Sequence, residues 1–191
     1  MLKLHRKLVG LSLGWIVLTL SPLSAQSAKP KDRGYFVRPP SLEATRVTQA
    51  QVFAQGATYY FTLSLPNHDN TPLQQISIAQ QDAANRARFI QFDPTQAEVF
   101  VGTPDQKGEL IPVREAQFDP DKQTLLLTLD SPVQPGDTVT VALHPKRNPR
   151  RDGLYLFGIT AFPTGTTPQG QFLGFGRIQF YGDENAAFES D

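Results

Sequence analysis

Strict alternation of apolar and polar residues is the feature that most constrains the fold of this chain. In TYYFTLSL, one face of an extended strand would carry Tyr59, Phe61, Leu63 and Leu65. The same period of two recurs in QQISIAQ, TLLLTL and TVTVAL, whose inward residues would be Ile76, Ile78, Leu125, Leu127, Leu129, Val139, Val141 and Leu143. This pattern predicts antiparallel strands with one face on a core and the other in water.

Turn sequences rich in Pro and Gly, such as SPVQPGD, separate these runs at short spacing. Shorter strand candidates lie around Val99 and Phe118, and the stretch 81–88 is compatible with either a short helix or a polar loop. We therefore predict an all-β protein, a single immunoglobulin-like antiparallel β-sandwich that spans residues 46–182 and is preceded by an N-terminal signal helix.

The N-terminal segment has the organisation of a secretory signal. Lys3, Arg6 and Lys7 precede an apolar run over residues 8–20, and small residues allow cleavage after Ala25 or Ser27. The run is shorter than the roughly 20 apolar residues of a spanning helix, so we expect a signal peptide over 1–25 and no stable membrane span after its cleavage. The expected location is the periplasm, with the thylakoid lumen or the extracellular space as alternatives. Residues 26–45 are interpreted as a Pro- and charge-rich linker or arm, and residues 183–191 as an acidic flexible tail.

Charge and sulfur content exclude several functions. Three of the 18 basic residues and none of the 18 acidic residues lie in the first 25, so the remainder has 15 basic against 18 acidic residues, a net charge of −3. A mildly acidic chain is a poor candidate for nucleic-acid binding. There is no Cys, and the single Met is Met1, so no soft sulfur ligand remains for a redox centre and no cofactor is expected.

A cluster of basic residues in HPKRNPRRDG is the first candidate site. Arginine forks match carboxylate and phosphate groups, so Lys146, Arg147, Arg150 and Arg151 form a possible binding site for an anion or a partner. An acidic envelope glycan, a lipid head group or an acidic protein patch would fit them, and a simple solvated loop is the alternative.

The last two strand candidates, GLYLFGITAF and GQFLGFGRIQFYG, are apolar on both faces. Their second face must be covered by the N-terminal arm, the middle segment or a partner. The possible partner or ligand face comprises Tyr155, Leu173, Phe175, Arg177 and Tyr181. The glycines do not form a dinucleotide loop, because the third glycine and the following helix are missing. We expect Gly174 and Gly176 to admit an aromatic ring such as that of Phe157 or Phe162.

The residues suggest three other kinds of binding site. A periplasmic small-ligand or metal-binding protein would need His68 and His144 to converge, although no metal-binding motif is present. A glycan platform would need Tyr155, Tyr181 and Phe175 to be exposed and coplanar. Asp119 and Asp121 in FDPDKQT resemble part of a calcium loop but are also ordinary turn residues. No catalytic motif is found, so an enzyme is not expected.

Several motifs occur together in the order seen in one known family. RNPRRDGLYLFGITAFPTG followed by GQFLGFGRIQFY, together with FTLSLP and PVQPGDTVTVALHPKRNP, resembles the DUF2808 family of cyanobacterial secreted proteins. The resemblance covers roughly residues 45–182. It implies an exported all-β domain and carries no catalytic residues. We therefore predict a non-enzymatic envelope module that binds an envelope protein or an anionic polymer.

Overall fold

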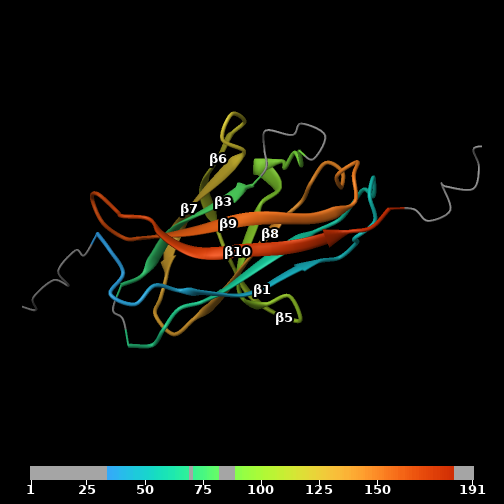
Figure 1. The fold of residues 1–191 in the computed structure, drawn as a ribbon. Helices are drawn as coiled ribbons and strands as arrows, with labels where there is room; N and C mark the ends of the chain where they lie inside the picture. Colours follow the sequence, from blue (N-terminus) through green and yellow to red (C-terminus); the bar gives the residue numbers. More distant parts are fainter. Residues whose placement is uncertain (1–33, 69–70, 82–88, 183–191) are drawn as a thin grey trace, which may run out of the picture. The chain divides into compact units, whose positions relative to one another are not determined.

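The computed structural model describes residues 34–68, 71–81 and 89–182, and they form two antiparallel five-stranded sheets (Figure 1). The expected signal helix, the stretch 82–88 and the acidic tail lie outside the described residues. Among the described residues, no helix is long and apolar enough to cross a membrane. A 3-10 turn, η2, spans Pro94–Gln96 before β4.

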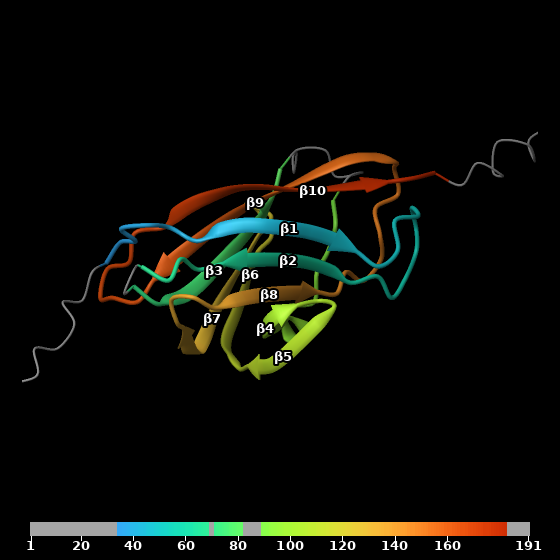
Figure 2. The same ribbon diagram turned by 90° about the horizontal axis from the view of Figure 1, so that it is seen from below.

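The first sheet has the strand order β1-β2-β8-β4-β5, and the second has the order β10-β9-β3-β7-β6. The strands of the first sheet, seen together in Figure 2, are β1 (Ser41–Val47), β2 (Tyr59–Ser64), β8 (Thr138–Leu143), β4 (Glu98–Thr103) and β5 (Gln106–Ile111). Those of the second sheet are β10 (Gln171–Phe180), β9 (Gly153–Pro163), β3 (Leu73–Gln80), β7 (Thr124–Val133) and β6 (Val113–Asp119). The all-β immunoglobulin-like sandwich predicted from the sequence is confirmed.

The core lies between the sheets and is built from the alternating residues. On the first sheet, Tyr59, Phe61 and Leu63 of β2 are opposite Leu143, Val141 and Val139 of β8, and all six side chains are buried. From the second sheet, Phe157 of β9 meets the ring of Phe61 edge-on, with 5.5 Å between centroids. The predicted inward residues of β3, β7 and β8 are all buried as well.

The N-terminal boundary of the sandwich lies earlier than residue 46. Strand β1 begins at Ser41 and pairs with β2, and Phe36 before it is buried in the core. The last part of the stretch interpreted as an arm is therefore an edge strand of the domain. The Pro- and charge-rich composition of this stretch gave no sign of a strand. An edge strand buries only one face, and here only Leu42 and Val47 pack against the core.

The last strand changes parity at a β-bulge. The register of β10 against β9 shifts between Phe172 and Gly174, and Gly174 has a φ of +129°. The shift turns Phe172 to the outer face, whereas Leu173 packs against the core. Phe172 therefore does not share the inner face with Ile178 and Phe180, although simple alternation would put all three on one side, because the extra residue reverses the side of every later one.

The two glycines of β10 have different neighbours from those expected. A Cβ on Gly176 would lie 2.6 Å from Thr45 Oγ1 and 3.0 Å from Cε1 of Phe61, so this glycine permits close packing of β10 against β1 and β2. Gly174 has no atom near its Cβ position and serves the bulge instead. Gly176 therefore admits an aromatic ring, that of Phe61, and Phe157 is its paired residue on β9.

Hairpin β4–β5 bends back over the outer face of the first sheet. Its tip carries Asp105, whose carboxylate accepts a hydrogen bond from Arg46 on β1 at 2.5 Å. Strands β8 and β2 lie between β4 and β1, so the tip must reach across both of them. Thr140 of β8 donates to the carbonyl oxygen of Gly102 at 2.7 Å, which attaches the bend to the sheet.

Candidate functional site: a rigid basic loop

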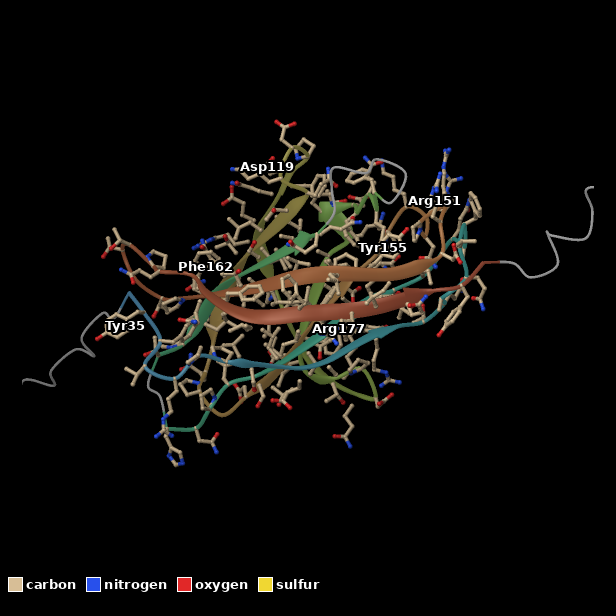
Figure 3. All side chains as sticks on the ribbon, viewed as in Figure 1. Tyr35, Asp119, Arg151, Tyr155, Phe162 and Arg177 are labelled. Carbon is tan, nitrogen blue, oxygen red and sulfur yellow. The ribbon has the colours of Figure 1, made fainter. Side chains whose placement is uncertain are left out.

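The four predicted basic residues lie on one loop at an end of the sandwich. This basic loop, residues 144–151, connects the end of β8 to the start of β9. In Figure 3, Arg151 lies at the opposite end of β9 from Tyr35. The placement agrees with the chain, because Gly34 lies against Thr167 in the connection that follows β9.

A buried asparagine holds the basic loop in place. Asn148 is 2% exposed, and its Oδ1 accepts a hydrogen bond from the Tyr59 hydroxyl at 2.8 Å. Its Nδ2 donates to the carbonyl oxygens of Gln49 at 2.9 Å and Gln51 at 2.8 Å, and its backbone N–H donates to Ala54 at 2.8 Å. The side chain thus satisfies one acceptor and two donors, which fixes the loop to β2 and to the turn after β1.

Backbone contacts on both sides of Asn148 complete the attachment. The N–H of Lys146 donates to the carbonyl oxygen of Gln91 at 2.9 Å, and that of Phe53 donates to Pro149 at 3.1 Å. The hydroxyl of Tyr155 donates to the carbonyl oxygen of Arg151 at 2.8 Å. The loop is therefore bonded to the turn after β1, to β2, to Gln91 and to β9. Its charged side chains project from this fixed backbone.

The four basic side chains are on exposed residues and lack salt-bridge partners in the described part of the chain. Elsewhere on the domain, Arg46, Lys107 and Lys122 each pair with a carboxylate. Asp93 is among the acidic groups near the loop: hydrogen bonds from Thr95 and Gln96, with a contribution from the charge of Lys146, lower its pKa. Asp93 offsets Lys146. Asp152 follows Arg151 in the chain, but the arginines form no ion pair within the described residues.

Two hollows flank Lys146. The larger, of about 330 Å³, is lined by Phe89, Gln91, Lys146, Arg147, Asn148, Pro149 and Arg150. The smaller, of about 280 Å³, is lined by Gly56, Ala57, Asp93, Gln96, His144, Pro145 and Lys146. The larger hollow combines three cations with an aromatic wall, and this combination suits an anionic group carried on an apolar or ring-shaped body.

An exposed phenylalanine lies beside the basic loop. The guanidinium carbon of Arg147 is 5.8 Å from the ring centroid of Phe53, a cation–π distance. Phe53 is 53% exposed and has a φ of +60°. Its sequence context, QVFAQG, carries no signal for this role, since three consecutive apolar residues in a loop have no periodicity. For Asn148, the only available signal was its place before a proline in the basic run.

The predicted partner face on β9 and β10 is only partly assembled. Phe175, Arg177 and Tyr181 are exposed, whereas Tyr155 is 2% exposed and packs edge-on against Phe180. Leu173 is turned toward the core by the bulge. A coplanar platform of Tyr155, Tyr181 and Phe175 is therefore not present, because the first of these rings is inside the sandwich.

The outer face of β9 and β10 carries a different aromatic pair. The rings of Phe172 and Phe175 meet at 5.1 Å and 68°, and a Cβ on Gly158 would contact both. This pair covers the bare backbone of β9, with Gln81 also over Gly158. The N-terminal edge strand β1 lies beside β10, and its residues 42–45 line a hollow together with Phe175 and Arg177.

The two histidines do not converge. His144 follows β8 and shares a hydrogen bond of 3.2 Å with Thr58, at the start of β2. His68 follows the other end of β2, and six strand residues separate the two positions by roughly 20 Å. This separation excludes a shared metal ion, whose ligand bonds are about 2 Å long. In the described ranges, no group of three or more His, Cys, Asp or Glu residues is arranged to hold a metal.

The acidic turn in FDPDKQT serves local structure. The carboxylate of Asp119 accepts hydrogen bonds from the backbone N–H groups of Asp121 and Lys122 at 3.0 and 3.1 Å. These bonds, with that from the Lys122 side chain, lower the pKa of Asp119. Its observed role is thus to cap the β6–β7 turn.

The fold and the site define an immunoglobulin-like β-sandwich with a basic loop that buried hydrogen bonds hold at one end. Residues 33–180 match DUF2808, described as a protein of unknown function, and the chain belongs to this family. A search of curated proteins found no match.

Solved structures of similar fold include BslA, a bacterial hydrophobin. Its sequence is 14% identical to this chain, the match covers 77% of this chain and 97% of that chain, and the TM-score is 0.47. The collagen-binding domain of a Staphylococcus aureus adhesin is 8% identical to this chain. The match covers 65% of this chain and 87% of that domain, and the TM-score is 0.36. The pilus backbone RrgB of Streptococcus pneumoniae is 11% identical to this chain. The match covers 66% of this chain and 53% of that chain, and the TM-score is 0.42.

Proposed function

We propose that this protein is an exported, non-enzymatic binding module that holds an anionic polymer of the cell envelope on its basic loop. The observation that carries the proposal is the contrast between a rigid backbone and unpaired charge: Asn148 fixes the loop, while Arg147, Arg150 and Arg151 have no described carboxylate partner.

Preorganisation explains why such a loop suits binding. A flexible basic loop would lose conformational entropy when its charges converged on a ligand. Here the backbone bonds to Gln91 and Phe53 already hold the main chain from which the arginines project. Guanidinium groups then match carboxylate, sulfate or phosphate oxygens through paired hydrogen bonds.

Export rests on the N-terminal sequence, with its basic start, apolar run and small residues before residue 28. The absence of cysteine leaves the fold independent of the redox state of its surroundings. A periplasmic location would place the basic loop among anionic envelope polymers.

The test is binding of the purified full chain to immobilised dextran sulfate, with neutral dextran as the reference polymer. Binding should weaken steeply between about 50 and about 500 mM salt, because screening shortens the reach of exposed charges. Arg150→Gln with Arg151→Gln should weaken it about tenfold, since each exposed contact contributes up to about 1 kcal/mol.

The control removes two positive charges elsewhere, by Arg38→Gln with Arg114→Gln, and so keeps the net charge of the test variant. Both residues are exposed and lie outside the basic loop. An equal loss of binding in both double variants would contradict a site at the loop and indicate general charge attraction. Unchanged binding in the Arg150/Arg151 variant would contradict the proposal directly.

A further inference from the structure

We infer that Phe53, which lies beside the basic loop, contacts the bound ligand. The polymer held there is an acidic polysaccharide whose sugar rings stack on the phenyl ring of Phe53. The inference rests on the proposed function and adds to it the substrate class and a residue from another segment. Its support is the backbone conformation, exposure and position of Phe53.

The conformation of Phe53 is unusual for its residue type. A φ of +60° places it in the left-handed region, which glycine enters freely and a bulky side chain enters at a cost. The neighbourhood enforces this conformation. Val52 donates to Tyr181 at 2.9 Å, Phe53 donates to Pro149 at 3.1 Å, and Ala54 accepts from Asn148 at 2.8 Å.

The fold itself gains little from a phenyl ring at this position. The residue is 53% exposed and does not belong to the core cluster. Glycine would adopt the same backbone without strain, and an exposed ring contributes only part of its burial energy to folding. Strained residues held by surrounding structure are concentrated at functional sites, and here the strain presents a ring to solvent.

The ring lies where a charged sugar would need it. Arg147 contacts Phe53 and also lines the larger hollow, with Lys146 and Arg150 further along its wall. A pyranose unit on the apolar face of Phe53 would bring its carboxylate or sulfate group beside the guanidinium group of Arg147. Phe89 supplies a second aromatic surface in the hollow. A ring beside a cation favours an anionic sugar over an anion without a ring.

The test compares the full chain with Phe53→Gly on four polymers: polygalacturonate, dextran sulfate, polyphosphate and neutral dextran. Glycine retains the left-handed backbone, so the melting temperature should be unchanged or higher. Binding to both acidic polysaccharides should fall at least fivefold, while binding to polyphosphate should change less than twofold. Polygalacturonate and dextran sulfate separate a carboxylate from a sulfate ligand.

Two further variants identify the cause of any loss. Phe53→Tyr retains an aromatic ring and should keep most of the binding to the acidic polysaccharides. Tyr35→Ala removes a ring that is 55% exposed at the other end of the domain and should change nothing.

Three outcomes would overturn the inference: an unchanged affinity of Phe53→Gly for the acidic polysaccharides, an equal loss on all anionic polymers, or a lowered melting temperature together with lost binding. In the first two, charge-driven binding that still depends on Arg150 and Arg151 would leave the proposed function standing. If the unmodified chain binds none of the anionic polymers, the proposed function and this inference both fail.

Discussion

The hydroxyl of Tyr59 donates a hydrogen bond of 2.8 Å to Oδ1 of Asn148, and both side chains are buried. This bond connects the centre of the core to the basic loop, because Tyr59 also contacts Phe92, Phe157 and Phe180. The position of the charged loop is thus set by the same residue that packs the core.

Asn148→Ala should destabilise the domain by about 3 kcal/mol, because the Tyr59 hydroxyl and the carbonyl groups of Gln49 and Gln51 lose a buried partner. Tyr59→Phe should cost about 1–2 kcal/mol, since the two carbonyl contacts remain. Urea unfolding measures both, with Gln117→Ala on exposed β6 as the control near zero. A loss below about 1 kcal/mol for Asn148→Ala would contradict the anchoring role.

Stability should fall in alkaline solution because of Tyr59. Burial, with a smaller contribution from Tyr155, raises the pKa of the Tyr59 phenol above its ordinary value. The contribution is complete below the unfolded-state pKa of about 10, and above it the unfolded chain releases a proton that the folded chain retains. The free energy of unfolding should then drop by about 1.4 kcal/mol per pH unit.

Urea unfolding of wild type and Tyr59→Phe between about pH 9 and about pH 11 isolates this effect, because the other tyrosines are common to both. The variant should lack this part of the alkaline slope. Parallel curves for the two proteins would show that Tyr59 ionises in the folded state.

Gly176 and Gly158 should respond differently to alanine. At Gly176 the new Cβ would meet Thr45 and the fully buried Phe61, so the variant should lose about 1–3 kcal/mol. At Gly158 it would meet Phe172 and Phe175 at 3.3 and 3.6 Å, and these exposed rings can move. Gly158→Ala should therefore stay within about 0.5 kcal/mol of wild type in thermal unfolding. Equal losses at the two sites would contradict the close packing assigned to β1 and β10.

Asp105→Asn should loosen the tip of hairpin β4–β5 without unfolding the domain. The ion pair with Arg46 is exposed, so its loss should change the free energy of unfolding by less than about 1 kcal/mol. Hydrogen exchange at residues 103–106 should accelerate, and salt should produce the same effect in the wild type by screening. Unaltered exchange at the tip would show that the contact of Thr140 with Gly102 holds the hairpin alone.

Much of the sandwich could be predicted because burial of one face imposes a period of two on each strand. Leu125, Leu127 and Leu129 show this plainly, since every second residue faces the core. Alternation does not hold through Phe172, where a bulge inserts one residue, and the predicted domain start missed the first residues of β1, where composition resembled a linker. Neither a bulge nor a half-buried edge strand leaves a periodic signal.

For the candidate site, local sequence identified the cations but not their support. The sequence identifies Arg147, Arg150 and Arg151 as a basic cluster, because the charge of a residue does not depend on its neighbours in the fold. The role of Asn148 depends on Tyr59 and Gln49, which lie 89 and 99 residues away in the chain. Phe53 lies beside Arg147 with its backbone left-handed and bonded to Pro149, and nothing in its local sequence indicates this position.

The sequence by itself thus determined the strands and the charge of the loop, because periodicity and residue chemistry are local. The tertiary structure alone decided which side chains meet at the loop, because those contacts depend on sheet order and on hydrogen bonds between distant segments.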